Sequence, residues 1–198
     1  MAPLILITGG CRSGKSGFGQ RLAENIPGRR LFIATCPCLD EEMAARISRH
    51  QQDRKDKGWL TVEEPLAPVD AVNGAKPGTT ILLDCLTLWI SNLLFAAENK
   101  GRELTEERIT QHALQLATVA RNHEGTVLMV TNEVGLGIVP ENAVARRYRD
   151  LVGRCNQTLA AAADQVYLVS CGIPLQLKRS VNDHEEYKQH LLSGGNIS

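Results

Sequence analysis

The chain has 198 residues, of which 43% are hydrophobic and 22% charged, a composition typical of a globular protein long enough for one domain of ordinary size. Its 22 basic and 22 acidic residues give a formal net charge of zero, which disfavours nucleic acid and membrane surfaces as partners, because both select a basic surplus. The apolar runs are far shorter than the ~18 residues of a membrane span, so we expect no membrane attachment.

Cysteine usage indicates a reducing compartment. The six thiols (Cys11, Cys36, Cys38, Cys85, Cys155 and Cys171) are scattered, and no signal peptide is recognisable, so we expect a cytoplasmic protein with free cysteines. Cys36-Pro-Cys38 resembles half of a metal site, but no second Cys or His pair at zinc spacing accompanies it. We therefore interpret the cysteines as structural.

Short apolar runs alternate with segments of helical periodicity. The predicted strands are residues 3–8, 31–34, 60–63, 79–84, 126–131, 166–169 and a hairpin strand at 173–177. The first predicted helix begins after the glycines that follow residue 8 and ends at Pro27. Four more helices are predicted: residues 40–57, 86–95, a segment that is capped by Thr105 and reaches residue 120, and 144–162. The polar segment 182–198 is expected to form a loosely held helix with a frayed end.

This alternation predicts an α/β fold with a mostly parallel sheet and helices on both faces. No repeat or low-complexity linker interrupts the chain. We therefore expect a single domain over residues 1–180, with 181–198 as its polar C-terminal tail.

Residues 9–16, GGCRSGKS, match the Walker A pattern at the point where the first strand gives way to a helix. Glycines let successive backbone N–H groups turn toward phosphate oxygens, and the positive end of the following helix adds to their field. Lys15 is expected to reach the β- and γ-phosphates, and Ser16 to bind Mg²⁺. The strand 79–84 ends in Asp84, which we interpret as a second metal partner, the Walker B acid.

A nucleotide-driven switch or motor agrees poorly with the remaining sequence. Asp150 and Gly153 have the spacing of a GTPase motif but lie within a helical pattern, and Asn99-Lys100 lacks the following x-Asp of a guanine-binding motif. Small size and neutral charge disfavour a helicase or motor. Transfer of a group to a small molecule is the class that remains.

The segment 40–54 contains a histidine, His50, among the cations Arg46, Arg49 and Arg54. Imidazole is a competent nucleophile near neutral pH and can carry a phosphoryl or nucleotidyl group. A solvated surface histidine is the alternative. The glycine-containing loop 132–140 follows a strand end, where open α/β sheets build their sites. This loop either borders the substrate site or is merely a turn. Residues 146–150, RRYRD, form either a solvated face or a partner contact.

Taken together, these stretches resemble one family, the bifunctional adenosylcobinamide kinase / adenosylcobinamide-phosphate guanylyltransferases of cobalamin biosynthesis. The resemblance runs in order through GGCRSGKS, FIATCPCLDEEMAARISRHQQDR, TVEEP, LLDCLTLWISNLL and VTNEVGLGIVPENAVARRYRDLVGRCNQTLAAAADQVYLVSCGIPLQLK, nearly all of residues 4–178. It implies phosphorylation of adenosylcobinamide by ATP or GTP, and then transfer of GMP from GTP through a GMP-histidine intermediate. The matching histidine is His50.

The resemblance also implies a RecA-like P-loop fold, Mg²⁺, a homotrimeric assembly and a set of nucleotide-site residues. That set comprises Gly9, Gly10, Cys11, Arg12, Ser13, Gly14, Lys15, Ser16, Ala34, Thr35, Cys36, Gln51, Gln52, Asp53, Arg54, Glu63 and Asp84, with His50 and Lys15 as the catalytic pair. Cys36 and Cys38 depart from what is expected in that loop. A P-loop kinase of another metabolite, and a nucleotide-binding regulatory subunit, are the alternatives.

Overall fold

The computed structural model describes residues 2–36, 54–55 and 57–179, and these form one seven-stranded sheet. The strands are β1 (Leu4–Thr8), β2 (Arg30–Ala34), β3 (Trp59–Glu63), β4 (Thr80–Asp84), β5 (Val127–Val130), β6 (Gln165–Ser170) and β7 (Ile173–Lys178). Their order is β3-β2-β4-β5-β1-β6-β7. All pairs are parallel except β6 with β7, which form an antiparallel hairpin.

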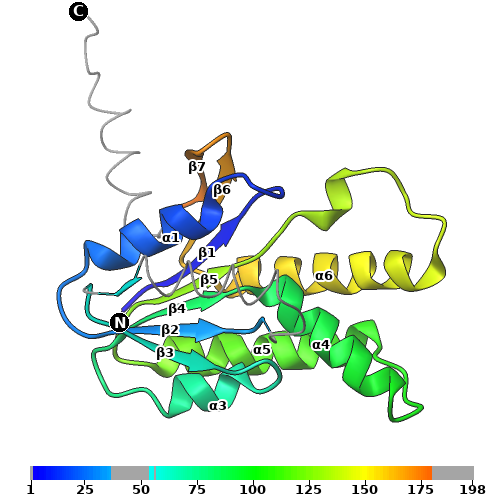
Figure 1. Cartoon of the computed structure of the whole chain (residues 1–198), viewed down its shortest axis with the longest axis horizontal. Helices are drawn as coiled ribbons and strands as arrows, with labels where there is room; N and C mark the ends of the chain where they lie inside the picture. Colours follow the sequence, from blue (N-terminus) through cyan, green and yellow to red (C-terminus); the bar gives the residue numbers. More distant parts are fainter. Residues whose placement is uncertain (1, 37–53, 56, 180–198) are drawn as a thin grey trace, which may run out of the picture.

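The central strands β1, β4 and β5 are apolar along nearly their whole length because both faces of the sheet are covered. One face packs against α1 (Lys15–Glu24), whose Ala23 joins a cluster with Ile5, Ile7 and Leu82. The other face packs against α3 (Pro68–Asn73), α4 (Leu86–Glu98), α5 (Glu106–Asn122) and α6 (Ala143–Ala162). Figure 1 shows this division, with α1 alone above the sheet and the other labelled helices below or behind it.

Because the strands are parallel, their carboxyl ends meet at one edge of the sheet. The loops 9–14 and 131–142 and the start of α6 all lie beyond that edge (Figure 1). The predicted α/β fold with helices on both faces is therefore confirmed, and every predicted strand is present within two residues of its predicted bounds.

Two short elements were not predicted. The six-residue α3 and the 3-10 helix η1 (Val134–Leu136) each span fewer than two turns, too few for a helical period to be visible in the sequence. The predicted helix 40–57 and the polar tail 182–198 lie largely or entirely outside the described residues. No helix in the described part of the chain has the length and apolarity to cross a bilayer.

Candidate nucleotide-binding site

The glycine-rich loop 9–14 follows β1 directly and ends just before Lys15, the first residue of α1. Two of its glycines are required sterically: a Cβ on Gly9 would lie 2.3 Å from the Val169 carbonyl oxygen, and Gly14 has φ of 94°, a left-handed conformation that favours glycine. The N-cap of α1 is Gly14, which has no side chain with which to cap the helix. The helix therefore begins with backbone N–H groups and a positive dipole end, which together suit an anion.

Hydrogen bonds from both neighbouring strands hold the loop. The backbone N–H of Gly172, in the β6–β7 turn, donates to the Ser13 carbonyl at 2.8 Å, and that of Glu133, after β5, donates to the Gly9 carbonyl at 3.1 Å. Cys11 and Arg12 at the tip are exposed. The buried Ser13 hydroxyl has no hydrogen-bond partner among the described residues, as expected for a group that binds a ligand oxygen.

Lys15 lies across the mouth of the loop. Its ammonium donates to the Gly10 carbonyl at 2.9 Å and to the Asn132 side-chain oxygen at 3.0 Å. An ammonium has three donors, so these two bonds leave one for a phosphate oxygen. The structure thus connects the loop to the first residues after β5.

Three of the predicted site residues lie side by side at the carboxyl edge of the sheet. Ala34 at the end of β2 is in register with Glu63 of β3 on one side and Asp84 of β4 on the other. Strand β5 separates β4 from β1, so Asp84 is two strand spacings, about 10 Å, from the strand that leads into the loop. Asp84 therefore lies at the same carboxyl edge as the loop, with β5 between β4 and β1.

Asp84 and Lys15 both act on the Cys85 thiol, which follows Asp84 directly. Burial, then the neighbouring Asp84 carboxylate, raise the pKa of the Cys85 thiol to about 11, while the Lys15 charge acts in the opposite direction. A Ser16 hydroxyl and an Asp84 carboxylate are hard oxygen donors that suit Mg²⁺. Within residues 2–36, 54–55 and 57–179, no three His, Cys, Asp or Glu side chains form a metal cluster.

Thr35 is fully buried, and all of its polar atoms bond within the protein. Its hydroxyl donates to the Cys85 carbonyl at 2.7 Å and accepts from the Cys85 N–H at 2.9 Å. Its N–H donates to the Asp84 carbonyl, and its carbonyl accepts from the Asn92 amide at 2.8 Å. Thr35 therefore fixes the end of β4 beside Asp84. Neighbouring Cys36 is half-buried.

Arg54 lies on the face of the sheet that α1 covers. It is 5% exposed, and its guanidinium carbon is 3.6 Å from the centre of the Phe32 ring, a cation–π distance.

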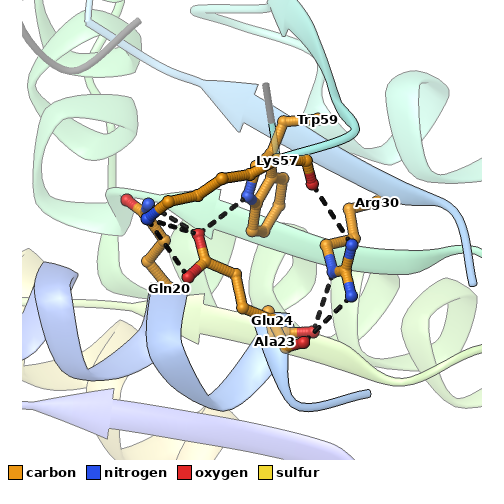
Figure 2. Close-up of polar contacts among 6 residues, drawn as sticks. All are labelled: Gln20, Ala23, Glu24, Arg30, Lys57 and Trp59. Carbon is orange, nitrogen blue, oxygen red and sulfur yellow. Dashed lines mark hydrogen bonds and ion pairs between the residues drawn. The ribbon is translucent and has the colours of Figure 1, made fainter. Parts of the chain in front are cut away.

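The residues just before and at the start of β3 are attached to the C-terminal end of α1. Lys57 and Trp59 both donate to the Glu24 carboxylate, as does Gln20 (Figure 2). The chain that enters β3 is thereby fixed to the helix that begins at the phosphate loop.

Arg30 completes this attachment. Its guanidinium donates to the carbonyls of Ala23, Glu24 and Ile26, at the end of α1, and to that of Lys57. The pKa of Glu24 is lowered: burial alone would raise it, but the donors Gln20, Trp59 and Lys57 stabilise the ionised form.

A buried polar network beside Lys15 was not predicted from the sequence. The Asn156 side chain on α6 bonds to three consecutive residues, Thr131, Asn132 and Glu133. The Glu133 carboxylate also accepts from the Thr8 hydroxyl at 2.6 Å. One signal was available: Asn156 follows buried Val152 by four residues and precedes buried Leu159 by three, so an amide lies in an apolar helical stripe.

The basic run 146–150 holds the loop after β5. Arg146 donates to the carbonyls of Pro140 and Glu141, and Arg149 to those of Gly135 and Ile138. With the loop backbone bound in this way, the side chains of Leu136, Ile138 and Val139 are displayed to solvent. Arg146 and Arg149 therefore have a structural role in forming the loop.

The predicted residues His50, Gln51, Gln52 and Asp53 lie outside the described residues. Of the chain's five histidines, two are described, and neither lies near the phosphate loop. The His112 ring packs against Trp89 on the face covered by α3–α6. His123 is 2.8 Å from the Thr79 carbonyl, at the amino edge of the sheet.

A glycine-rich loop between strand and helix, a lysine at its mouth and an acid at the carboxyl end of β4 define a P-loop nucleotide-binding protein of the α/β class. Residues 5–177 match the family described as cobinamide kinase / cobinamide phosphate guanyltransferase. The chain therefore belongs to this family of bifunctional transferases, which act on a corrinoid in adenosylcobalamin biosynthesis.

Three similar proteins carry matching names. The bifunctional adenosylcobalamin biosynthesis protein CobU of Salmonella typhimurium is 44% identical over 186 residues, covering 88% of this chain and 99% of the relative. CobU of Escherichia coli is 40% identical, covering 88% and 99%. The bifunctional adenosylcobalamin biosynthesis protein CobP of Pseudomonas aeruginosa is 37% identical, covering 87% and 96%.

Proposed function

We propose that one triphosphate site serves both transfers, and that only the second transfer uses a histidine nucleophile. The observation that carries this proposal is the position of Lys15, which is held at the mouth of the loop by Gly10 and Asn132. Asp84 ends β4 at the same edge of the sheet. The family supplies the acceptor, a cobinamide.

In the kinase reaction, the hydroxyl of the aminopropanol arm of adenosylcobinamide attacks the γ-phosphorus of ATP or GTP. A new O–P bond forms, the bond to the β–γ bridging oxygen breaks, and the nucleoside diphosphate leaves while the hydroxyl proton is lost. Loop N–H groups and Lys15 stabilise charge on the phosphate oxygens during this transfer. This step requires positioning of the hydroxyl but no protein nucleophile.

In the guanylyltransferase reaction, an imidazole nitrogen of His50 attacks the α-phosphorus of GTP, and pyrophosphate leaves. The phosphate of adenosylcobinamide phosphate then displaces His50, giving adenosyl-GDP-cobinamide. Two displacements replace one difficult transfer. The same loop that presents a γ-phosphate in the first reaction here holds the departing pyrophosphate.

Ser16 and Asp84 are the residues proposed to hold Mg²⁺. Mg²⁺ is commonly bound through one or two carboxylates together with substrate phosphates, which agrees with a site that offers one carboxylate and one hydroxyl. When bound, the ion would neutralise charge on the phosphates. Ala34, Cys36 and Glu63 lie at the same sheet edge, and we propose that they line the nucleotide site with Arg54 and residues 51–53.

Radiolabelling tests this proposal. Incubation with α-labelled GTP is expected to label the protein through a phosphoramidate that is stable to base and labile to acid. His50→Ala should remove the label, whereas His112→Ala, a matched change on the far face of the sheet, should retain it. An unlabelled wild-type protein, or equal labelling of His50→Ala, would contradict the assignment of His50.

We also infer a homotrimer, in agreement with the family resemblance. Strand β7 forms one edge of the sheet, and its alternate residues Ile173, Leu175 and Leu177 are each more than half exposed. Alternate residues share one face of a strand, and a row of exposed apolar side chains on a sheet edge suits a protein interface. Light scattering should report a trimer, and Leu175→Lys should shift it toward monomer; a monomeric wild type would refute the assembly.

A further inference from the structure

Asn156 joins α6 to the residues that follow β5. It is 8% exposed, its side-chain oxygen accepts from the Thr131 hydroxyl at 2.6 Å, and its nitrogen donates to the Asn132 carbonyl at 3.3 Å and the Glu133 carboxylate at 3.4 Å. Thus both ends of this one amide are used, its oxygen as acceptor and its nitrogen as donor.

The residues held by Asn156 are the ones that contact the phosphate loop. Asn132 accepts from the Lys15 ammonium. Glu133 accepts from the Thr8 hydroxyl and donates its backbone N–H to the Gly9 carbonyl. A continuous path of hydrogen bonds therefore runs from the middle of α6 to the lysine and to the first residue of the loop.

We propose that Asn156 is a positioning residue of the nucleotide site, which fixes Asn132 and Glu133 and, through Asn132, the ammonium of Lys15. This inference rests on the proposed function in one respect only, namely that Lys15 binds the triphosphate. Asn156 acts through its neighbours, and its effect is expected equally in both reactions because they share Lys15.

The path requires an amide at this position. A leucine of similar size would fill the space but leave the Thr131 hydroxyl and the Asn132 carbonyl without a buried partner. An aspartate would still accept from the Thr131 hydroxyl. It would, however, place a second carboxylate against the Glu133 carboxylate and against the Asn132 carbonyl oxygen. Like charges in contact raise a carboxyl pKa, so protonation of that aspartate would restore a donor.

Two variants and one control test the proposal by equilibrium binding of a non-hydrolysable GTP analogue and by the kinetics of both reactions. Asn156→Leu should weaken triphosphate binding about tenfold, the loss associated with hydrogen bonds to charged groups. The control is Leu159→Ala, one turn along α6 and 1% exposed. It should lower stability through a cavity and leave triphosphate binding as in the wild type.

Asn156→Asp adds a pH signature that a purely structural role would not give. Its triphosphate binding should improve as the pH falls from about 8 to about 6, because the new carboxyl gains a proton beside Glu133, and Leu159→Ala should show no such recovery. The inference would be overturned, with the proposed function left intact, by either of two results. Both Asn156 variants could bind the triphosphate as tightly as the wild type, or Asn156→Leu and Leu159→Ala could lose equal triphosphate affinity. A wild-type protein that binds no triphosphate would refute the proposed function as well.

Discussion

Thr35 and Cys85 exchange two hydrogen bonds through a single hydroxyl group, which donates to the Cys85 carbonyl at 2.7 Å and accepts from the Cys85 N–H at 2.9 Å. These residues follow the last residues of β2 and β4, respectively. The family resemblance places Thr35 in the nucleotide site. Its fully buried side chain is occupied within the protein, so we infer that it serves the site by fixing the backbone next to Asp84.

Thr35→Val should therefore destabilise the protein without a change in side-chain shape. The valine leaves the Cys85 N–H without its acceptor, whereas the Cys85 carbonyl keeps the bond from the Trp89 N–H. Loss of a buried partner costs about 1–3 kcal/mol in the free energy of unfolding. Denaturant unfolding measures the change. Thr110→Val is the matched control, since its hydroxyl bonds an exposed helical carbonyl, and it should alter stability by less than about 0.5 kcal/mol. If both variants lost the same free energy of unfolding, the buried Thr35 hydroxyl would contribute no more to stability than the exposed Thr110 hydroxyl.

Lys15→Ala and His50→Ala should separate the two reactions. In the proposed mechanism Lys15 contacts the phosphates in both reactions, so its removal should lower the rate of each about 100-fold or more, as for other groups that stabilise transition-state charge. His50→Ala should abolish guanylyl transfer and leave phosphorylation of adenosylcobinamide near the wild-type rate. Separate assays of the two products measure this, and loss of both activities from a folded His50→Ala protein would argue against separate roles.

The cysteines should differ widely in reactivity. Burial, with the charge of Asp84, raises the pKa of Cys85 to about 11, and burial raises that of Cys155 to about 12. Both thiols should remain protonated near neutral pH, where only the thiolate is nucleophilic. Iodoacetamide should therefore modify the exposed Cys11 and Cys171 first, as peptide mass spectrometry can show. Early alkylation of Cys85 in the folded protein would contradict its raised pKa.

The strands and the phosphate loop were predictable because their signals are local. Residues 4–7 are apolar and contiguous, and Gly9 to Ser16 form a short motif with a fixed spacing. By contrast, α3 has only six residues, and part of its support comes from the Glu64 carboxylate, which accepts from the N–H groups of Leu66 and Ala67 just before it. A helix of that length depends on tertiary packing, which no periodicity reveals.

The polar network around Lys15 could not be predicted for a different reason. Thr131 and Asn156 are 25 residues apart in sequence, and Thr8 and Glu133 are 125 apart. The fold alone brings these pairs together, since β1 lies beside β5 and α6 packs against both. The sequence therefore predicts the glycine-rich loop but not the side chains that hold it in place.

The attachment of β3 to α1 through Glu24 should depend on pH. The pKa of Glu24 is lowered in the folded protein because the hydrogen bonds from Gln20, Trp59 and Lys57 outweigh the effect of burial. A lowered pKa stabilises the folded state above the unfolded value of about 4.3, and this stabilisation is lost as the pH falls through the folded-state pKa. Glu24→Gln should thus be less stable than the wild type near neutral pH, with the difference shrinking below about pH 4.

Urea unfolding of the wild type and of Glu24→Gln across this pH range measures that difference directly. Glu98→Gln, an exposed change at the end of α4, controls for the general effect of removing one carboxylate. Because the glutamine can still accept from Trp59 and Lys57 but carries no charge, a pH-independent difference would assign the stabilisation to hydrogen-bond geometry. A difference that grows as the pH falls would mean that the Glu24 carboxylate is destabilising, which would contradict the direction of its pKa shift.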